Sequence, residues 1–94
     1  MKNTAPLPKR TYREIGRNRR RLLRLAYETY PQYVYCDPEE FTWYEPAGRV
    51  NIFDLYYLAD SGYVEVTQDA SGGHRRPDFY ILTPRGADLL EVTG

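Results

Sequence analysis

The chain has 94 residues, of which 41% are hydrophobic and 28% charged, and its 13 basic residues balance 13 acidic ones. A chain of this length forms one domain, which buries roughly 60 to 65 per cent of its unfolded surface. Its single cysteine, Cys36, excludes an internal disulfide and a multi-cysteine zinc site, and it fits a reducing compartment. No apolar run approaches the roughly 20 residues that span a bilayer, and the N-terminus lacks the apolar segment of a secretion signal, so we expect a cytoplasmic protein without membrane contact.

The charges are unevenly distributed along the chain. Residues 1–30 carry nine Lys or Arg and two Glu, a net charge of +7, whereas residues 31–70 carry one Arg and eight acidic residues, a net charge of −7. The remaining residues balance at three and three. This order predicts a dipolar surface, which can face a polyanion with one side and another protein with the other, or join copies of the chain.

The first helix is expected to follow a flexible arm. Residues 1–10 hold two prolines and little apolar content, which is typical of a mobile segment. Thr11 and Glu14 have the spacing of a capping box, which predicts a helix that continues to the next proline. We therefore expect an arm of residues 1–10 and a domain of residues 11–94. Gly16 and Arg19 interrupt the helical pattern, so a break near residue 17 is possible.

This predicted helix has two chemically different faces. Its apolar residues fall on one stripe at 3.6-residue spacing, namely Ile15, Leu22, Leu23, Ala26 and Tyr30. The opposite side carries an arginine ridge, made of Arg13, Arg17, Arg20, Arg21 and Arg24. Five arginines with few acids beside them exceed what solubility requires, so we expect phosphate contacts, which fix position on DNA without reading sequence. The alternative is an ordinary charged helix face. Lys9 and Arg10 of the arm would follow the DNA backbone or a groove.

Two further helices are expected before the first strand. Asp37 can cap a short helix that has Pro38 at its first position and ends at Pro46. A third helix is expected from residue 51, and Gly62 supplies its left-handed stop. Its buried stripe consists of Ile52, Leu55, Leu58 and Ala59.

The outward positions of the third helix are mixed in chemistry. They are Phe53, Asp54, Tyr57 and Asp60, with Arg49 and Asn51 at the start of the helix. Arginine pairs with guanine and asparagine with adenine, so Arg49 and Asn51 are the candidates for base contact, although Asn51 can instead serve as the helix cap. Two carboxylates on this face would repel phosphates. Exposed aromatic residues such as Phe53 and Tyr57 more often mark a protein contact.

The last third of the chain predicts a hairpin and a closing helix. "YVEVT" and "DFYIL" have the β-branched and aromatic character of strands, and the ten residues from Gln68 to Pro77 between them form a long tip. This tip carries His74, Arg75 and Arg76, which would be attracted to the negative potential of a DNA groove. The alternative is a solvated loop. Thr83 and Pro84 then predict the start of a short final helix.

A family resemblance rests on the stretch from Leu55 to Leu90, about 36 of the 94 residues. It resembles the winged helix-turn-helix part of bacterial regulators of the PadR and MarR families. Its most specific positions are Leu58, Gly62, Val64, Glu65, Arg75, Arg76, Leu82, Thr83, Pro84, Arg85 and Gly86. The resemblance implies an α+β winged helix-turn-helix fold with a three-helix core, a β-hairpin wing and a short C-terminal helix. Both families dimerise through long flanking helices, for which this chain has no segment of sufficient length.

Catalysis and metal binding have little support in the sequence. His74 is the only histidine, and Cys36 has no sequence neighbour that would lower its pKa. The pair Glu39 and Glu40 is explained by helix capping. We therefore expect no enzyme activity, no catalytic residues, no metal site and no cofactor.

The sequence leads to two hypotheses about function. The first is a DNA-binding protein, a small prokaryotic or phage transcriptional regulator, in which the arginine ridge and the wing arginines form one continuous footprint on double-stranded DNA. It assigns DNA contacts to Arg17, Arg20, Arg21, Arg24, Arg49, Asn51, His74, Arg75 and Arg76. The second is a protein-interaction module, in which Phe53 and Tyr57 contact a partner protein or a second copy in a homodimer.

Overall fold

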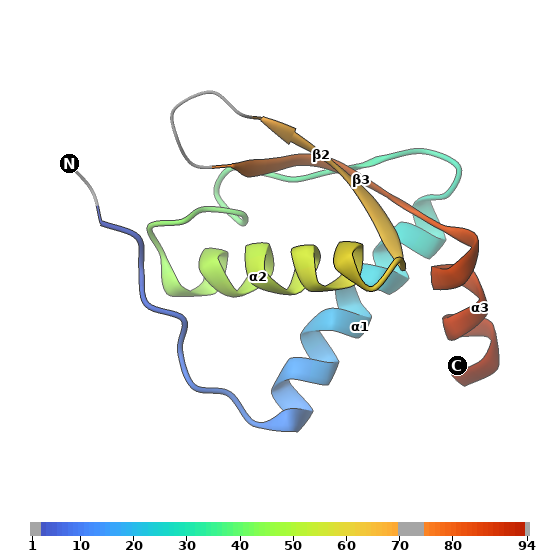
Figure 1. Ribbon diagram of the computed structural model, residues 1–94, viewed down its shortest axis with the longest axis horizontal. Helices are drawn as coiled ribbons and strands as arrows, with labels where there is room; N and C mark the ends of the chain where they lie inside the picture. The colour runs from blue at the N-terminus through green and yellow to red at the C-terminus, as the bar shows by residue number, and fades with distance from the viewer. Residues whose placement is uncertain (1–2, 70–74, 94) are drawn as a thin grey trace.

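The first helix, α1 (Tyr12–Thr29), forms as its end signals predict. The backbone N–H of Glu14 donates to Thr11 Oγ1 at 3.1 Å, and the backbone N–H of Thr11 donates to Glu14 Oε1 at 3.1 Å, so the capping box is confirmed. Leu22, Leu23 and Ala26 are buried, as predicted. The possible break after Gly16 does not occur, because the helix continues through it. The computed structural model describes residues 3–69 and 75–93 (Figure 1).

The prediction of a short helix between Asp37 and Pro46 is wrong. The backbone N–H groups of Glu40 and Phe41 both donate to the Asp37 carbonyl at 2.9 Å, which makes a single turn. The Asp37 side chain still caps this turn, since it accepts from the N–H of Glu39 at 2.9 Å. Phe41 is buried in the core, and this packing directs the chain inward where a helix would have continued. Two helices therefore precede the hairpin in the described part of the chain, and the predicted three-helix core is corrected to two.

The second helix, α2 (Pro46–Asp60), starts at the proline that was expected to end an element. Proline is well suited to the first helical position, because the missing N–H is one that a helix start leaves unpaired. Asn51 consequently lies within α2 and is not its cap. The helix ends at Asp60 with Ser61 as its C-cap, and Gly62, which follows, has the predicted left-handed conformation with φ of +84°.

The sheet contains three antiparallel strands in the order β1-β3-β2. They are β1 (Val34–Tyr35), β2 (Val64–Asp69) and β3 (Arg76–Leu82). The hairpin of β2 and β3 is confirmed, with Val64 opposite Leu82. Both strands continue beyond the predicted ends, and Asp69 pairs with Arg76, so part of the predicted tip is strand.

The last helix, α3 (Pro84–Thr93), begins at the predicted Thr-Pro pair. Thr83 Oγ1 accepts from the N–H of Gly86 at 3.1 Å and donates to the Gly62 carbonyl at 2.6 Å. One hydroxyl therefore caps α3 and ties its start to the end of α2.

The core lies between the sheet and helices α1 and α2, which cover one of its faces (Figure 1). Its centre is formed by Ile52, Leu55 and Tyr80, none of which is exposed. The Tyr80 hydroxyl donates to the Leu22 carbonyl at 2.9 Å, so the sheet and α1 are joined by a buried hydrogen bond. No helix within residues 3–69 and 75–93 has the length and hydrophobicity needed to cross a bilayer.

Candidate functional site

The arginine ridge occupies the face of α1 that points away from the core. Arg13, Arg17, Arg20, Arg21 and Arg24 are all exposed, whereas Leu22, Leu23 and Ala26 are buried on the other face. With a rise of 1.5 Å per residue, the ridge is about 16 Å long. Together with Tyr12 and Gly16, its five arginines line a shallow groove. The predicted separation of the two faces is confirmed for Leu22, Leu23 and Ala26, whereas Ile15 is half-buried and Tyr30, at the C-cap of α1, is exposed.

The guanidinium groups of the ridge have no carboxylate partner among the described residues. The ion pairs in residues 3–69 and 75–93 involve Arg10 and Arg19, which both bind Asp54. Of the ridge arginines, Arg21 donates to the side-chain oxygens of Asn18 and Asn51, at 2.9 and 3.0 Å. The ridge is therefore a positively charged surface without a salt bridge in these ranges. The Glu14 carboxylate is nevertheless near one of its charges, since the pKa of Glu14 is lowered mainly by hydrogen bonds with Thr11 and in part by Arg17.

Asp54 was expected to face outward, and this prediction is wrong. Its side chain is fully buried and accepts hydrogen bonds from Arg10 Nη1 at 2.7 Å, Arg10 Nη2 at 2.9 Å, Asn18 Nδ2 at 2.7 Å and Arg19 Nε at 3.1 Å. Burial raises the pKa of this carboxyl, but the hydrogen bonds from Arg10, Asn18 and Arg19 outweigh it and hold the pKa below its usual range. Asp54 is thus the acceptor that joins α2 to α1 and to the N-terminal segment.

The N-terminal segment, residues 3–10, forms no helix or strand but contacts α2 and the turn before it. Ala5 is buried, and its N–H donates to the Trp43 carbonyl at 2.7 Å. Lys9 is exposed, whereas Arg10, which was expected to follow DNA, forms the bidentate pair with Asp54. A DNA contact by Arg10 would break this pair.

The two candidates for base contact already bind other parts of the protein. Asn51 Nδ2 donates to the Glu40 carbonyl at 2.8 Å, and Asn51 Oδ1 accepts from Asn18 and Arg21. Arg49 Nη1 donates to the Ala5 carbonyl at 2.6 Å, and its guanidinium lies 5.2 Å from the ring centre of Trp43. Asn51 could contact a base only by giving up its hydrogen bonds to Glu40, Asn18 and Arg21. Arg49 could contact a base with the N–H groups that do not bind the Ala5 carbonyl.

Of the two arginines predicted to lie in the wing, Arg75 directly precedes β3 and Arg76 is its first residue. Arg75 is exposed, and its carbonyl accepts from Trp43 Nε1 at 3.0 Å. Arg76 is half-buried, and its Nη1 has no hydrogen-bond partner among the described residues. His74, with most of the predicted tip, lies outside the described residues.

The ridge and the wing arginines do not form one surface. The buried face of α1 is directed toward α2 and β3, as the hydrogen bond between Tyr80 and Leu22 shows, so the ridge faces away from the hairpin. In Figure 1 the first half of α1 and the tip end of the hairpin lie at opposite edges of the molecule, with α2 between them. The single continuous footprint expected by the DNA hypothesis is therefore wrong, and any DNA contact by the ridge is separate from the wing.

A second exposed surface lies on α2. The side chains of Phe53 and Tyr57 are 43% and 46% exposed, in agreement with their predicted outward positions. With Trp43, Arg49, Ile52, Tyr56 and Asp60 they line a hollow of about 280 Å³. The guanidinium of Arg19 lies 3.5 Å from the ring centre of Tyr57, which holds that ring from one side.

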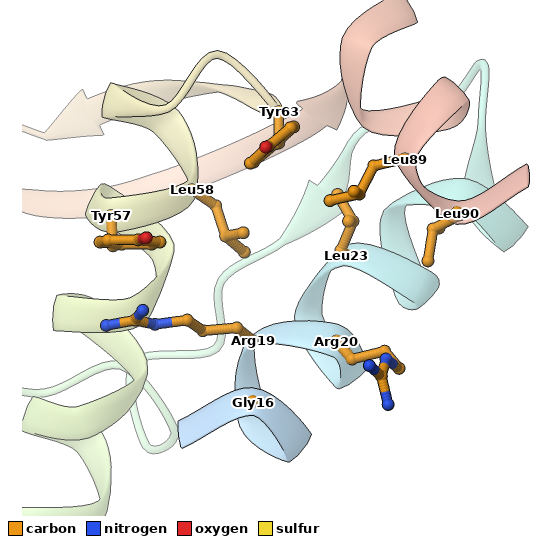
Figure 2. Close-up of a pocket in the computed structure, with 9 residues that line it drawn as sticks. All are labelled: Gly16, Arg19, Arg20, Leu23, Tyr57, Leu58, Tyr63, Leu89 and Leu90. Atoms are coloured by element: carbon orange, nitrogen blue, oxygen red, sulfur yellow. The ribbon is translucent and has the colours of Figure 1, made fainter. Parts of the chain in front are cut away.

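A further hollow of about 320 Å³ lies between α1, α2 and α3 (Figure 2). Leu23, Leu58, Leu89 and Leu90 give it an apolar lining. Figure 2 shows Arg19 pointing toward Tyr57 of α2, whereas Arg20 of the ridge points away from α2. Neighbouring arginines of α1 thus serve opposite sides of the helix.

Cys36 is buried, and burial raises the pKa of its thiol to about 12. A thiol with this pKa is protonated at neutral pH and is a poor nucleophile and metal ligand. Among residues 3–69 and 75–93, no three His, Cys, Asp or Glu side chains come together in a group able to hold a metal ion. The chain has no match among protein-family models, curated proteins or solved structures.

Proposed function

We propose that this chain is a DNA-binding domain of the winged helix-turn-helix type, in which the arginine ridge of α1 contacts the phosphates of double-stranded DNA. The order of elements supports this assignment: a helix that ends just before the left-handed Gly62 is followed by a long hairpin and by a helix that starts at Pro84. A regulatory role in transcription, in a bacterium or a phage, is the setting implied by the resemblance to PadR and MarR regulators.

The observation that carries the proposal is a ridge of five exposed arginines that forms no salt bridge among the described residues. Arg13 and Arg17, Arg17 and Arg21, and Arg20 and Arg24 are each four residues apart on α1. Like charges at this spacing destabilise a helix by about 0.2 to 0.5 kcal/mol per pair. A helix face of this kind weakens the free protein, and an external polyanion would reverse the effect by supplying the missing counter-charge.

The dimensions of the ridge suit a DNA strand. Over its length of about 16 Å, one strand of a duplex presents about five phosphates. Arginine forms forked hydrogen bonds with phosphate oxygens, and such contacts release counterions from DNA. Because the Asn51 amide is engaged inside the protein and one amino group of Arg49 is bound to the Ala5 carbonyl, we propose binding that is mainly independent of base sequence.

The test is a fluorescence anisotropy titration of a labelled duplex at about 50 and about 200 mM salt. We expect binding that weakens steeply between the two concentrations. The variant Arg17→Gln/Arg20→Gln/Arg24→Gln should bind more weakly, and its plot of log affinity against log salt should be shallower by about 3, because three phosphate contacts are lost.

The matched control is Arg85→Gln, which removes an exposed arginine from α3, outside the ridge. This variant should bind as the unmodified chain does. Absence of binding at about 50 mM salt, or equal losses in the control and the ridge variant, would contradict the proposal.

A second candidate function, protein interaction, is favoured by the outward face of α2. Its exposed residues Phe53 and Tyr57 are aromatic, and base edges offer such rings little beyond methyl contacts. Rigid aromatic side chains in a hollow are typical anchors of a protein interface. Under this function, Phe53→Ser/Tyr57→Ser would lose a partner in a pull-down or change the sedimentation profile.

A further inference from the structure

The outward face of α2 carries an apolar stripe that is only partly covered: Phe53 and Tyr57 are 43% and 46% exposed, and Arg19 lies over one side of the Tyr57 ring. Val50, Phe53 and Tyr57 are spaced by three and four residues, which places them on one line along the helix. The opposite face, with Ile52 and Leu55, is buried in the core. A helix that is apolar on two faces normally has a partner on each.

Two opposite charges flank this stripe. Arg49 and Asp60 belong to the lining of the same hollow as Phe53 and Tyr57, and helical geometry places both charges on the same edge of the stripe. They are separated by 11 positions, about 16 Å along the axis, and Phe53 and Tyr57 lie on either side of their midpoint. The face therefore carries a positive end, an aromatic centre and a negative end.

We propose that α2 pairs antiparallel with α2 of a second copy of this chain, about a two-fold axis through the middle of the stripe. This two-fold axis lies in the interface plane and runs perpendicular to the helix. Rotation about it reverses the direction of the second α2 helix, and it leaves the charged edges of the two stripes on the same side of the interface. Arg49 then meets Asp60 of the second copy, and Asp60 meets the other Arg49. Phe53 faces Tyr57 of the second copy. An interface of this type uses the same patch on both subunits.

Both charged groups have capacity for such a contact. Arg49 uses Nη1 for the Ala5 carbonyl, and its Nε and Nη2 make no hydrogen bond within the described residues. Asp60 is exposed and has no ion pair within residues 3–69 and 75–93. The charges required by the partner are those that this face itself carries, which is why a second copy fits better than an unrelated protein.

Two aromatic residues of this hollow, Tyr57 and Trp43, are held in place before any contact forms. The Tyr57 ring lies under the guanidinium of Arg19, and Trp43 Nε1 donates to the Arg75 carbonyl. Fixed side chains lose little conformational entropy on association. Because Arg20 of the ridge points away from α2, pairing through α2 leaves the ridges of both copies free (Figure 2). Two ridges on one dimer would bind DNA more tightly than one.

This inference rests on the second candidate function and names its partner, and sedimentation velocity tests it. An interface of one helix pair is small, so the unmodified chain should pass from monomer to dimer between about 5 and about 200 µM. Asp60→Arg and Arg49→Glu should each stay monomeric, because each places like charges opposite one another. An equimolar mixture of the two should form a heterodimer, since both pairs are then opposite in charge.

Glu65→Arg is the matched control, because it makes the same charge change at an exposed position on β2, and it should dimerise as the unmodified chain does. Circular dichroism of each variant separates loss of pairing from loss of folding. A monomeric unmodified chain at all concentrations, or a mixture that does not associate, would overturn the inference. Neither result contradicts the proposal that the ridge binds DNA. A monomer that still captures another protein through Phe53 and Tyr57 would support the second candidate function without the homodimer.

Discussion

The arginines on the two sides of α1 are chemically identical but have different surroundings. On the inner side, Arg19 joins Arg10 of the N-terminal segment at a fully buried carboxylate, Asp54. On the outer side, the ridge arginines are exposed and meet no carboxylate among the described residues. The comparison teaches that arginine content alone does not identify a binding surface. An arginine is available to a polyanion only when the fold leaves it without an internal partner.

The largest loss in the free energy of unfolding is expected for a substitution of Asp54, which binds the inner side of α1. Asp54→Ala removes the acceptor of four hydrogen bonds and leaves two guanidinium groups close together and partly buried. Breaking a buried ion pair in this way costs about 3 kcal/mol or more. Urea unfolding measures this loss, and Asp88→Ala, an exposed site on α3, should change stability by less than about 0.5 kcal/mol. Similar losses in both variants would remove the distinction between paired and exposed charges.

A single arginine of the inner side should have an intermediate effect. Arg10→Gln leaves Asp54 bound to Asn18 and Arg19, so we expect a loss of about 1 to 2 kcal/mol in the free energy of unfolding. Arg13→Gln makes the same substitution on the ridge and should be close to neutral. If the Arg13 variant is destabilised as much as the Arg10 variant, the two sides of α1 do not differ as the contacts indicate.

Low pH should reduce the stabilisation that Asp54 provides on the inner side of α1. The folded-state pKa of Asp54 is lower than the ordinary value, mainly because hydrogen bonds from Arg10, Asn18 and Arg19 outweigh the effect of burial. The stabilisation that ionised Asp54 gives to the folded protein is therefore complete above the unfolded-state pKa of about 4. It is lost as the pH falls through the lower folded-state pKa. The stability difference between the unmodified chain and Asp54→Asn should be constant above about pH 5 and shrink below about pH 4. The measurement is the denaturant midpoint of both proteins as a function of pH. If Asp54 were not the titrating group, the two curves of midpoint against pH would stay parallel below about pH 4.

The smallest effect, with the opposite sign, is expected on the ridge. Arg17→Gln/Arg20→Gln/Arg24→Gln removes the repulsion in all three like-charge pairs on α1, and this should raise stability by about 0.6 to 1.5 kcal/mol. Thermal unfolding at low salt detects the change, and added salt should reduce it, because salt screens exposed charges. A destabilised triple variant would mean that the ridge arginines have structural contacts, and it would weaken the case for an external partner.

Local signals in the sequence predicted most of the elements. The capping box at Thr11, the left-handed Gly62 and the Thr-Pro start of α3 all act over three or four residues, so their meaning does not depend on the rest of the fold. The short helix after Asp37 failed because the local cap formed but burial of Phe41 determined the path of the chain. The capping signal was real, and tertiary packing limited it to one turn.

The two faces of α1 follow from the sequence alone, because helical periodicity places the five ridge arginines opposite Leu22, Leu23 and Ala26 before any packing occurs. The sequence also determined the outward positions of Phe53 and Tyr57. Only the tertiary structure decided that Asp54 is buried, that Arg10 and Arg19 bind it, and that the ridge faces away from the wing. These facts depend on contacts between residues 35 to 58 positions apart in the chain, and sequence spacing carries no record of which charges will meet.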